Sequence, residues 1–392
     1  MTLASTIPAS SIRSYRSDSR LVGLDFLRFL ATSVVLCDHA KNFGEAGKLF
    51  ANTPGLIGIV LSTVSSMGWT AVQVFFVLSG FLVSGLLIQE VRKTGNVSPG
   101  RFLIRRGFKI YPAFWVMITV TIFWVLHKGG AISTIQVLSE LFYFQNYGRA
   151  VSFHTWSLAV EEHFYFLLAG IFLVVKWWTK PGQKLSLRWM PDLFLAVAVL
   201  CVLARGITWE VLLSPSVENY HWFILSDHAV IDSLFFGMLL SYYWHNTWSE
   251  EIIGKLMILS VPLAVAGVCL LLPVWPDLIG VQWFRIFGFI MLYLGAGCLL
   301  LSSLALDYFR CPRWVRSVAW LGQYSYSVYL WHLLSGYCVF PILSIKLDNM
   351  CGWILNAVIY FVSTWLVGII LARLIEFPVI RYRDRWYPSP SK

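Results

Sequence analysis

Ten long apolar runs, each close to the length needed to cross a lipid bilayer, constrain what this chain can fold into. A membrane-spanning helix needs about 20 mostly apolar residues. The runs lie roughly at 22–41, 69–90, 111–127, 155–178, 191–209, 223–244, 253–273, 284–305, 318–340 and 353–376. Only 13% of the 392 residues are charged and 58% are hydrophobic, unlike a soluble domain. The sequence therefore predicts an all-α polytopic integral membrane protein with about ten transmembrane helices.

Two further apolar stretches are too short to cross a bilayer. We predict that 55–67 forms a short or re-entrant external segment and that 132–147 lies at the membrane interface. The seven cysteines include no Cys-x-x-Cys pair and lie mostly inside apolar runs. This spacing indicates neither a disulfide framework nor a metal site, and we predict no metal ion for this chain.

The basic residues alternate from one inter-helix segment to the next. Of the 30 Lys and Arg residues, 22 fall on the side of the two termini, 7 fall on the opposite side, and Arg28 lies inside a span. Cytoplasmic loops are enriched in Lys and Arg, so we predict cytoplasmic termini. The net charge of +10 then reflects these loops, and we expect no nucleic-acid partner. The expected organisation is a polar cytoplasmic segment 1–20, a membrane domain 21–380 and a cytoplasmic tail 381–392.

The first span contains two ionisable residues, Arg28 and His39. Their separation of eleven residues corresponds to about three helical turns plus about 20°, so they share one helix face about 16 Å apart along the axis. Asp25 lies one turn before Arg28 and is placed to pair with it. Two such residues on one face indicate a functional site; the alternative is that Arg28 snorkels beside Asp25 and His39 is an interfacial histidine.

The fourth span contains two adjacent carboxylates, Glu161 and Glu162, one or two turns from its start. At that depth a carboxylate is placed to orient the ring of His39 and to stabilise its imidazolium, which is what general-base chemistry requires. Adjacent helical residues point about 100° apart, so we expect only one of the two to face His39, and the sequence does not say which. The alternative is the ordinary preference of acidic residues for a helix N-terminus.

The basic stretch 101–112 supports two interpretations equally. Arg105, Arg106 and Lys109 are either positive-inside anchors near lipid head groups or a cradle for the phosphates of an anionic cofactor.

Two later spans carry further polar residues. His228 and Asp232 are four residues apart in the sixth span and can meet on one helix face. His332 in the ninth span is either a second cavity residue or a structural histidine.

Several motifs, matched in order between residues 21 and about 380, carry a family resemblance. They are Leu24-Asp25-x-x-Arg28 with its ten-residue spacing to His39, Phe75 to Leu82, Phe102 to Pro112, Thr155 to Tyr165, Tyr324 to His332, and Glu376-x-Pro378. The chain resembles the acyltransferase 3 family, the bacterial membrane O-acyltransferases of sugars and exopolysaccharides. It resembles the standalone form, without the esterase-like domain that some members carry. Two departures are Lys109, where the family usually has Arg, and Val230-Ile231-Asp232, where many members have Arg-x-Asp.

The resemblance implies transfer of an acyl group, most often acetyl, from cytoplasmic acyl-coenzyme A to a glycan hydroxyl. Acetyl-CoA would be a co-substrate, with no permanently bound cofactor. A basic cluster of Arg105, Arg106 and Lys109 would hold the nucleotide phosphates.

The resemblance also implies catalytic roles at the outer end of the site. His39 would act as general base, with a transient acyl-histidine as the variant mechanism. Glu161 or Glu162 would lie beside His39, and Arg28 would position the donor or stabilise developing negative charge. Substrate contacts are expected from a further set, Ser157, Asp232 and His332.

The expected partners are a glycan or lipid-linked sugar acceptor, membrane lipid and polysaccharide biosynthesis machinery, at the bacterial cytoplasmic (inner) membrane. An exopolysaccharide or other cell-surface sugar is the expected acceptor, and a small glycoside such as a macrolide is an alternative. A transporter or flippase for acyl groups or glycans is a second hypothesis, because buried charges also line transport pathways.

Overall fold

The computed structural model describes residues 21–208, 226–272, 282–309 and 311–388, and within these ranges every regular element is a helix. The long helices are α2 (Val22–Ala40), α5 (Gly68–Thr94), α6 (Pro99–His127), α8 (Trp156–Trp178), α9 (Met190–Ile207), α16 (Gln282–Tyr308) and α20 (Met350–Leu371). The shorter α-helices are α3 (Gly44–Asn52), α4 (Gly55–Val64), α7 (Thr134–Leu141), α11 (Asp227–Val230), α12 (Asp232–Tyr242), α13 (Glu250–Ile258), α14 (Ser260–Leu271), α17 (Arg313–Gly322), α18 (Ser325–Leu334), α19 (Phe340–Leu343) and α21 (Phe377–Trp386). A 3-10 turn, η1 (Phe153–Thr155), and three π-helical turns, η3 (Tyr243–Thr247), η4 (Ser335–Val339) and η5 (Ala372–Glu376), complete the set.

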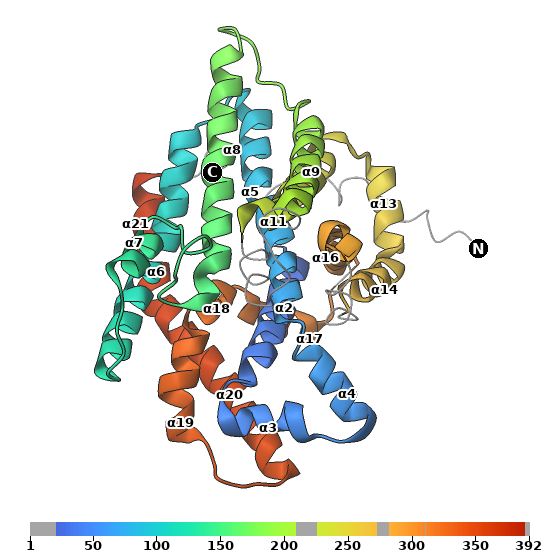
Figure 1. The fold of residues 1–392 in the computed structure, drawn as a ribbon. Coiled ribbons are helices and arrows are strands. Elements are labelled where there is room, and N and C mark those ends of the chain that lie inside the picture. Colours follow the sequence, from blue (N-terminus) through green and yellow to red (C-terminus); the bar gives the residue numbers. More distant parts are fainter. Residues whose placement is uncertain (1–20, 209–225, 273–281, 310, 389–392) are drawn as a thin grey trace, which may run out of the picture.

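The helices surround a central pair, α2 and α5 (Figure 1). In that view α6, α7, α8 and α21 lie on one side of the pair, and α13, α14 and α16 lie on the other. Helices α3, α4 and α19 gather at the lower end. Residues far apart in the chain are therefore brought together around α2 and α5.

Seven helices among the described residues are long and apolar enough to cross a membrane, and eight if the bent pair α13 and α14 counts as one span. This confirms an all-helical, multi-pass membrane architecture. The count of ten spans and the cytoplasmic termini stay predictions.

The predicted spans differ from the helices at several places. Helix α2 follows the predicted run 22–41, but its polar residues keep it outside the set of seven. Part of the run 223–244 lies outside the described residues, and the remainder is divided between α11 and α12. The run 253–273 is bent by 66° between α13 and α14.

Helix α6 begins twelve residues before the predicted run 111–127. Pro99 occupies its first turn, where the missing amide proton is no loss. The basic stretch 101–112 is therefore helical. Because residues four apart share a helix face, Arg101, Arg105 and Lys109 point to the same side.

The last candidate span, α20 with η5 and α21, is 37 residues long. At 1.5 Å per residue it measures about 55 Å, which exceeds the bilayer's hydrocarbon core of about 30 Å. Since α21 carries Arg381, Arg383 and Arg385, we place α21 at the end that leaves the apolar region.

Glycines set the spacing between α5 and α12. A Cβ atom on Gly80 would clash with the backbone oxygen of Leu234, and one on Gly237 would clash with the backbone oxygen of Val77. Small residues of this kind let helix backbones approach closely in membranes. The contact fixes the position of α5, which carries Ser79 next to Gly80.

Candidate functional site

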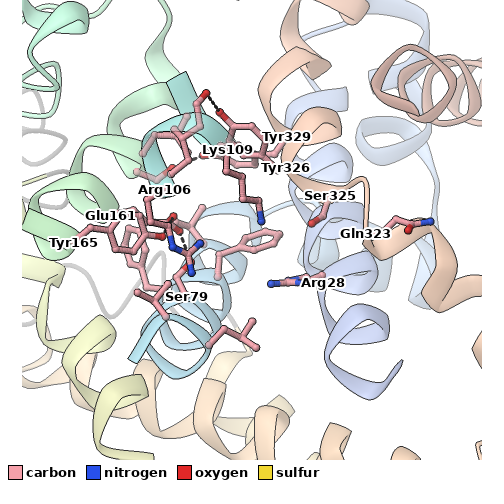
Figure 2. Close-up of a pocket in the computed structure, with 18 of the residues that line it drawn as sticks. Arg28, Ser79, Arg106, Lys109, Glu161, Tyr165, Gln323, Ser325, Tyr326 and Tyr329 are labelled. Carbon is pink, nitrogen blue, oxygen red and sulfur yellow. Dashed lines mark hydrogen bonds between the residues drawn. The ribbon is translucent and has the colours of Figure 1, made fainter. Parts of the chain in front are cut away.

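A cavity of about 300 Å³ lies among α2, α5, α6, α8 and α18, and we call it the central cavity (Figure 2). Its polar lining consists of Arg28, Ser79, Arg106, Lys109, Ser157, Glu161, Tyr165, Gln323, Ser325, Tyr326 and Tyr329. Figure 2 shows the charged ends of Arg28, Arg106 and Lys109 pointing toward the same space. Five residues singled out from the sequence meet here, namely Arg28, Arg106, Lys109, Ser157 and Glu161.

Glu161 is fixed in the cavity wall by two hydroxyl groups. Ser79 Oγ donates a hydrogen bond to one carboxylate oxygen at 2.9 Å, and the Tyr165 hydroxyl donates to the other at 2.8 Å. The Arg106 guanidinium lies 5.3 Å from the centroid of the Tyr165 ring, within the range of a cation–π interaction. Ser79 and Tyr165 thus hold the carboxylate in place, and Tyr165 also supports Arg106.

Two cations of the central cavity, Arg106 and Lys109, form no ion pair in the part of the chain that the structure describes. Arg28 pairs with Asp25 at 3.1 Å, as its spacing predicts. Among the described residues, no carboxylate lies within ion-pair distance of Arg106 or Lys109. Unpaired cations lining a cavity provide a binding site for an anionic group.

A second cavity of about 360 Å³ adjoins the first, and we call it the basic vestibule. The two cavities share Leu86, Arg106, Lys109 and Gln323. The charged residues that line the vestibule are Glu90, Arg101, Arg105, Arg106, Lys109, Glu376 and Arg383. The three residues predicted to hold phosphates are therefore together. Arg383 was not predicted, because the sequence does not show that the tail folds back on α6.

His39 lies in a cluster of three histidines. The His39 and His332 ring centroids are 4.8 Å apart, and those of His154 and His332 are also 4.8 Å apart. His332 Nδ1 lies 2.5 Å from the Tyr329 backbone oxygen, and its Nε2 is buried with no hydrogen-bond partner among the residues that the structure describes. Since Nδ1 donates to that carbonyl, Nε2 is the basic nitrogen of the ring.

Tyr329 separates the histidine cluster from the central cavity. Its ring lines the cavity and lies 5.6 Å from His154 and 5.7 Å from His332, centroid to centroid. Its hydroxyl donates to the His154 backbone oxygen at 2.9 Å and lies 2.7 Å from Ser157 Oγ. The cavity and the histidines are thus neighbours with one side chain between them.

The structure does not bring Glu161 or Glu162 to His39. Helix α8 directs Glu161 to Ser79 and Tyr165, and Glu162 accepts a hydrogen bond from the Tyr111 hydroxyl at 2.8 Å. In the described part of the chain, the ring that contacts His39 is that of His332, and the hydrogen bonds found for Glu161 and Glu162 go to Ser79, Tyr165 and Tyr111. The depth argument from sequence could not show which helix each carboxylate faces.

The acyltransferase domain family model matches residues 21–373. The chain belongs to this acyltransferase family.

Three curated proteins are similar to the chain in sequence. The peptidoglycan O-acetyltransferase OatA of Listeria monocytogenes is 25% identical over 333 residues, covering 80% of this chain and 51% of that protein. The putative peptidoglycan O-acetyltransferase YrhL of Bacillus subtilis is 27% identical over 321 residues, covering 71% and 48%. The O-acetyltransferase OatA of Staphylococcus aureus is 25% identical over 331 residues, covering 74% and 52%.

The chain spans about half the length of the curated relatives it matches. No solved structure matches it.

Asp232 lines neither the central cavity nor the basic vestibule. It forms a fully buried ion pair with Arg205, whose Nη2 is 2.5 Å from its Oδ2. Arg205 also donates to the backbone oxygens of Ala229 and Ile286. The geometry indicates a structural partner for Asp232 rather than the substrate contact expected from the sequence.

Glu140 was not singled out from the sequence, yet it organises the segment that carries His154. Its Oε1 accepts hydrogen bonds from the backbone amides of Val151 and Ser152 at 2.9 and 3.2 Å and from Thr155 Oγ1 at 3.0 Å. His154 is held further by Ser152 Oγ at Nδ1 and by the Leu330 backbone oxygen at Nε2. For His154, the signal available in the sequence was its position directly before the fourth predicted span, 155–178.

Replacing Glu140 with alanine should destabilise the protein by about 3 kcal/mol, because the backbone amides of Val151 and Ser152 lose their acceptor and Thr155 loses one of its two. Glu140→Gln should cost much less, since an amide oxygen can accept from the same donors. Thermal unfolding in lipid nanodiscs measures both. Equal losses for the two variants would contradict the role assigned to these hydrogen bonds.

Comparing the wild type with the Glu140→Gln variant also tests a predicted dependence of stability on pH. Burial raises the pKa of Glu140 from 4.5 to about 7. A raised pKa favours the protonated folded state, so this contribution is full below pH 4.5 and is lost as pH rises through 7. The thermal stability of the wild type relative to Glu140→Gln should therefore fall between about pH 5 and pH 8.

Proposed function

We propose that this acyltransferase moves an acetyl group from acyl-coenzyme A, bound from the cytoplasm, to a hydroxyl of a cell-surface glycan. The observation that carries the proposal is the pair Arg106 and Lys109, which form no ion pair among the described residues and line both cavities. They suit the phosphates of a donor whose acyl end reaches into the central cavity. The family membership and the names of the relatives support acetyl transfer.

The orientation follows from charge. The vestibule contains four arginines and one lysine, and positive residues concentrate on the cytoplasmic side of membrane proteins. We therefore assign the vestibule to the cytoplasmic side of a bacterial inner membrane. The histidine cluster then lies farther toward the outside, where a glycan acceptor arrives.

The reaction requires the acceptor hydroxyl to lose its proton and the acyl carbon to exchange its bond to sulfur for a bond to oxygen. In our proposal His39 accepts the proton of the acceptor hydroxyl while the oxygen of that hydroxyl attacks the thioester carbonyl carbon. The new carbon–oxygen bond forms, the carbon–sulfur bond breaks, and the coenzyme A thiolate leaves and takes up a proton. Arg28, which lines the central cavity, would stabilise the negative charge that develops on the carbonyl oxygen.

This route requires the Tyr329 side chain to move aside, because it separates the cavity from the histidines. Ser157, hydrogen-bonded to Tyr329, would keep the phenol in the closed position. The variant route, an acyl-histidine intermediate on His39, uses the same geometry.

The acceptor is a glycan with a free hydroxyl. Peptidoglycan is the acceptor named for two of the relatives, and an exopolysaccharide or lipid-linked sugar presents the same chemical group. Transport of acyl groups or glycans is the competing function, because polar cavities in helical bundles also serve transporters.

The test is to measure ester-linked acetyl groups in peptidoglycan and in exopolysaccharide by mass spectrometry. The strains are the wild type, a deletion, and the deletion complemented with the wild-type gene or with Lys255→Ala. Lys255 is an exposed surface residue and serves as the control variant. Acetyl esters should disappear from one glycan in the deletion and return in both complemented strains. Unchanged acetylation of both glycans in the deletion would contradict the proposal and favour a small glycoside acceptor or transport.

A further inference from the structure

Helix α21 lies beyond the residues matched by the family model, and it packs against α6 (Figure 1). The Phe108 ring contacts the rings of Tyr382 and Tyr387, at centroid distances of 6.2 and 6.0 Å. Arg383 Nη1 donates to the Arg105 backbone oxygen at 3.3 Å, and Arg105 donates to the Tyr387 backbone oxygen. The C-terminal helix is thus held against the basic part of α6.

This packing makes α21 one wall of the basic vestibule. Phe377, Ile380 and Arg383 line the vestibule beside Arg105. The side chains of Arg383 and Arg105 are only 12% and 20% exposed. Two guanidinium groups 278 positions apart in the chain therefore lie together at a partly desolvated surface, where charge-assisted hydrogen bonds are strong.

A single carboxylate joins these two arginines. Asp384 Oδ1 lies 3.1 Å from Arg105 Nη2 and 2.8 Å from Arg383 Nη2. Asp384 is 41% exposed, so displacing it into water costs little. A phosphate accepts hydrogen bonds from guanidinium groups in the same way as a carboxylate does.

We propose that Arg105 and Arg383 form an outer phosphate subsite for the acyl donor, in which Asp384 is the exchangeable counter-ion. The inference rests on the donor named under Proposed function. Arg101 is not part of the subsite, because its carboxylate partner at 2.8 Å, Glu90, is only 10% exposed and, unlike Asp384, is not readily displaced into water. The subsite adds residues outside the matched domain to donor recognition.

The order of the groups along coenzyme A determines which of its phosphates would reach Arg105 and Arg383. The diphosphate adjoins the pantetheine arm, and the 3′-phosphate lies on the ribose at the far end. Arg106 and Lys109 line both cavities, whereas Arg105 and Arg383 line only the vestibule. With the acyl end in the central cavity, the diphosphate meets Arg106 and Lys109, and the 3′-phosphate meets Arg105 and Arg383.

The test measures binding of coenzyme A and of 3′-dephospho-coenzyme A to the full chain in lipid nanodiscs. Arg383→Ala should weaken coenzyme A binding about tenfold or more and leave dephospho-coenzyme A binding unchanged. Arg383→Lys should restore part of the loss. Asp384→Asn should tighten coenzyme A binding severalfold, but not in an Arg383→Ala background. Arg381→Ala and Arg385→Ala, exposed on the same helix, are the matched controls and should bind as the wild type does.

The outcomes separate this inference from the proposed function. Equal weakening of both ligands by Arg383→Ala, or weaker coenzyme A binding by Asp384→Asn, would overturn the subsite and assign these residues to the docking of α21. Wild-type binding by Arg383→Ala would also overturn it. If the folded wild type binds neither ligand, the donor assignment itself fails.

Discussion

Replacing His39 with alanine should lower acetyl transfer by a factor of about 10² to 10⁴, the usual contribution of a general base. The variant keeps the donor cavity, because His39 lines neither the central cavity nor the vestibule. Binding of coenzyme A should therefore be unchanged while turnover is lost. Transfer of radiolabelled acetyl groups from acetyl-coenzyme A to purified glycan measures turnover directly.

The control for His39 is His127→Ala, which removes an exposed histidine at the end of α6 and should leave turnover unchanged. Thermal unfolding of each variant checks that the bundle is intact. Wild-type turnover by a folded His39→Ala protein would exclude His39 from the chemistry, whichever mechanism operates. Incubation of the wild type with labelled donor and no acceptor separates the mechanisms, because only an acyl-histidine retains label on the protein.

Replacing Arg205 with methionine should destabilise the protein by about 3–5 kcal/mol, because Asp232 is left as a buried charge without its partner. Both side chains are fully buried, so water cannot replace the lost guanidinium. The Arg205→Met/Asp232→Leu double variant should recover most of the loss, since apolar groups of similar volume often replace a buried pair at little cost. Thermal unfolding in nanodiscs compares the two proteins.

The double variant also tests the sequence-based role of Asp232. If the carboxylate is structural, the folded double variant should transfer acetyl groups at close to the wild-type rate. A stable double variant with no activity would instead return Asp232 to the substrate-binding residues. Stability should be recovered in the double variant under either role, whereas turnover should be retained only if Asp232 is structural.

The sequence predicted most helices well because apolar length alone determines a membrane span. It was less informative where a run contains a bend, as at the junction of α13 and α14. Hydropathy averages over such positions, whereas helix bounds depend on local features such as Pro99, which opens α6 well before the apolar run. The bounds of a helix are therefore set by individual residues, which a hydropathy average over the run does not detect.

The candidate site was predictable only where one helix carries its parts. Arg106 and Lys109 lie in one basic stretch of the sequence, the resemblance implied a joint role for them, and both line the central cavity. The contact between Arg105 and Arg383 joins residues 278 positions apart, and His154 meets Leu330 across 176 positions. Spacing along one helix cannot predict contacts between residues on different helices. For this reason Glu161 was expected beside His39, whereas it is hydrogen-bonded to Ser79 and Tyr165.

The Arg205–Asp232 pair also has a consequence for how the protein enters the membrane during synthesis. Arg205 lies in the last turn of α9 and leaves the ribosome 27 residues before Asp232. A lone guanidinium at a helix end is drawn toward the lipid surface. We therefore expect newly made α9 to sit shallowly until α12 emerges, and to reach its final depth only when the two helices associate. The insertion of α9 is then completed by a later part of the chain.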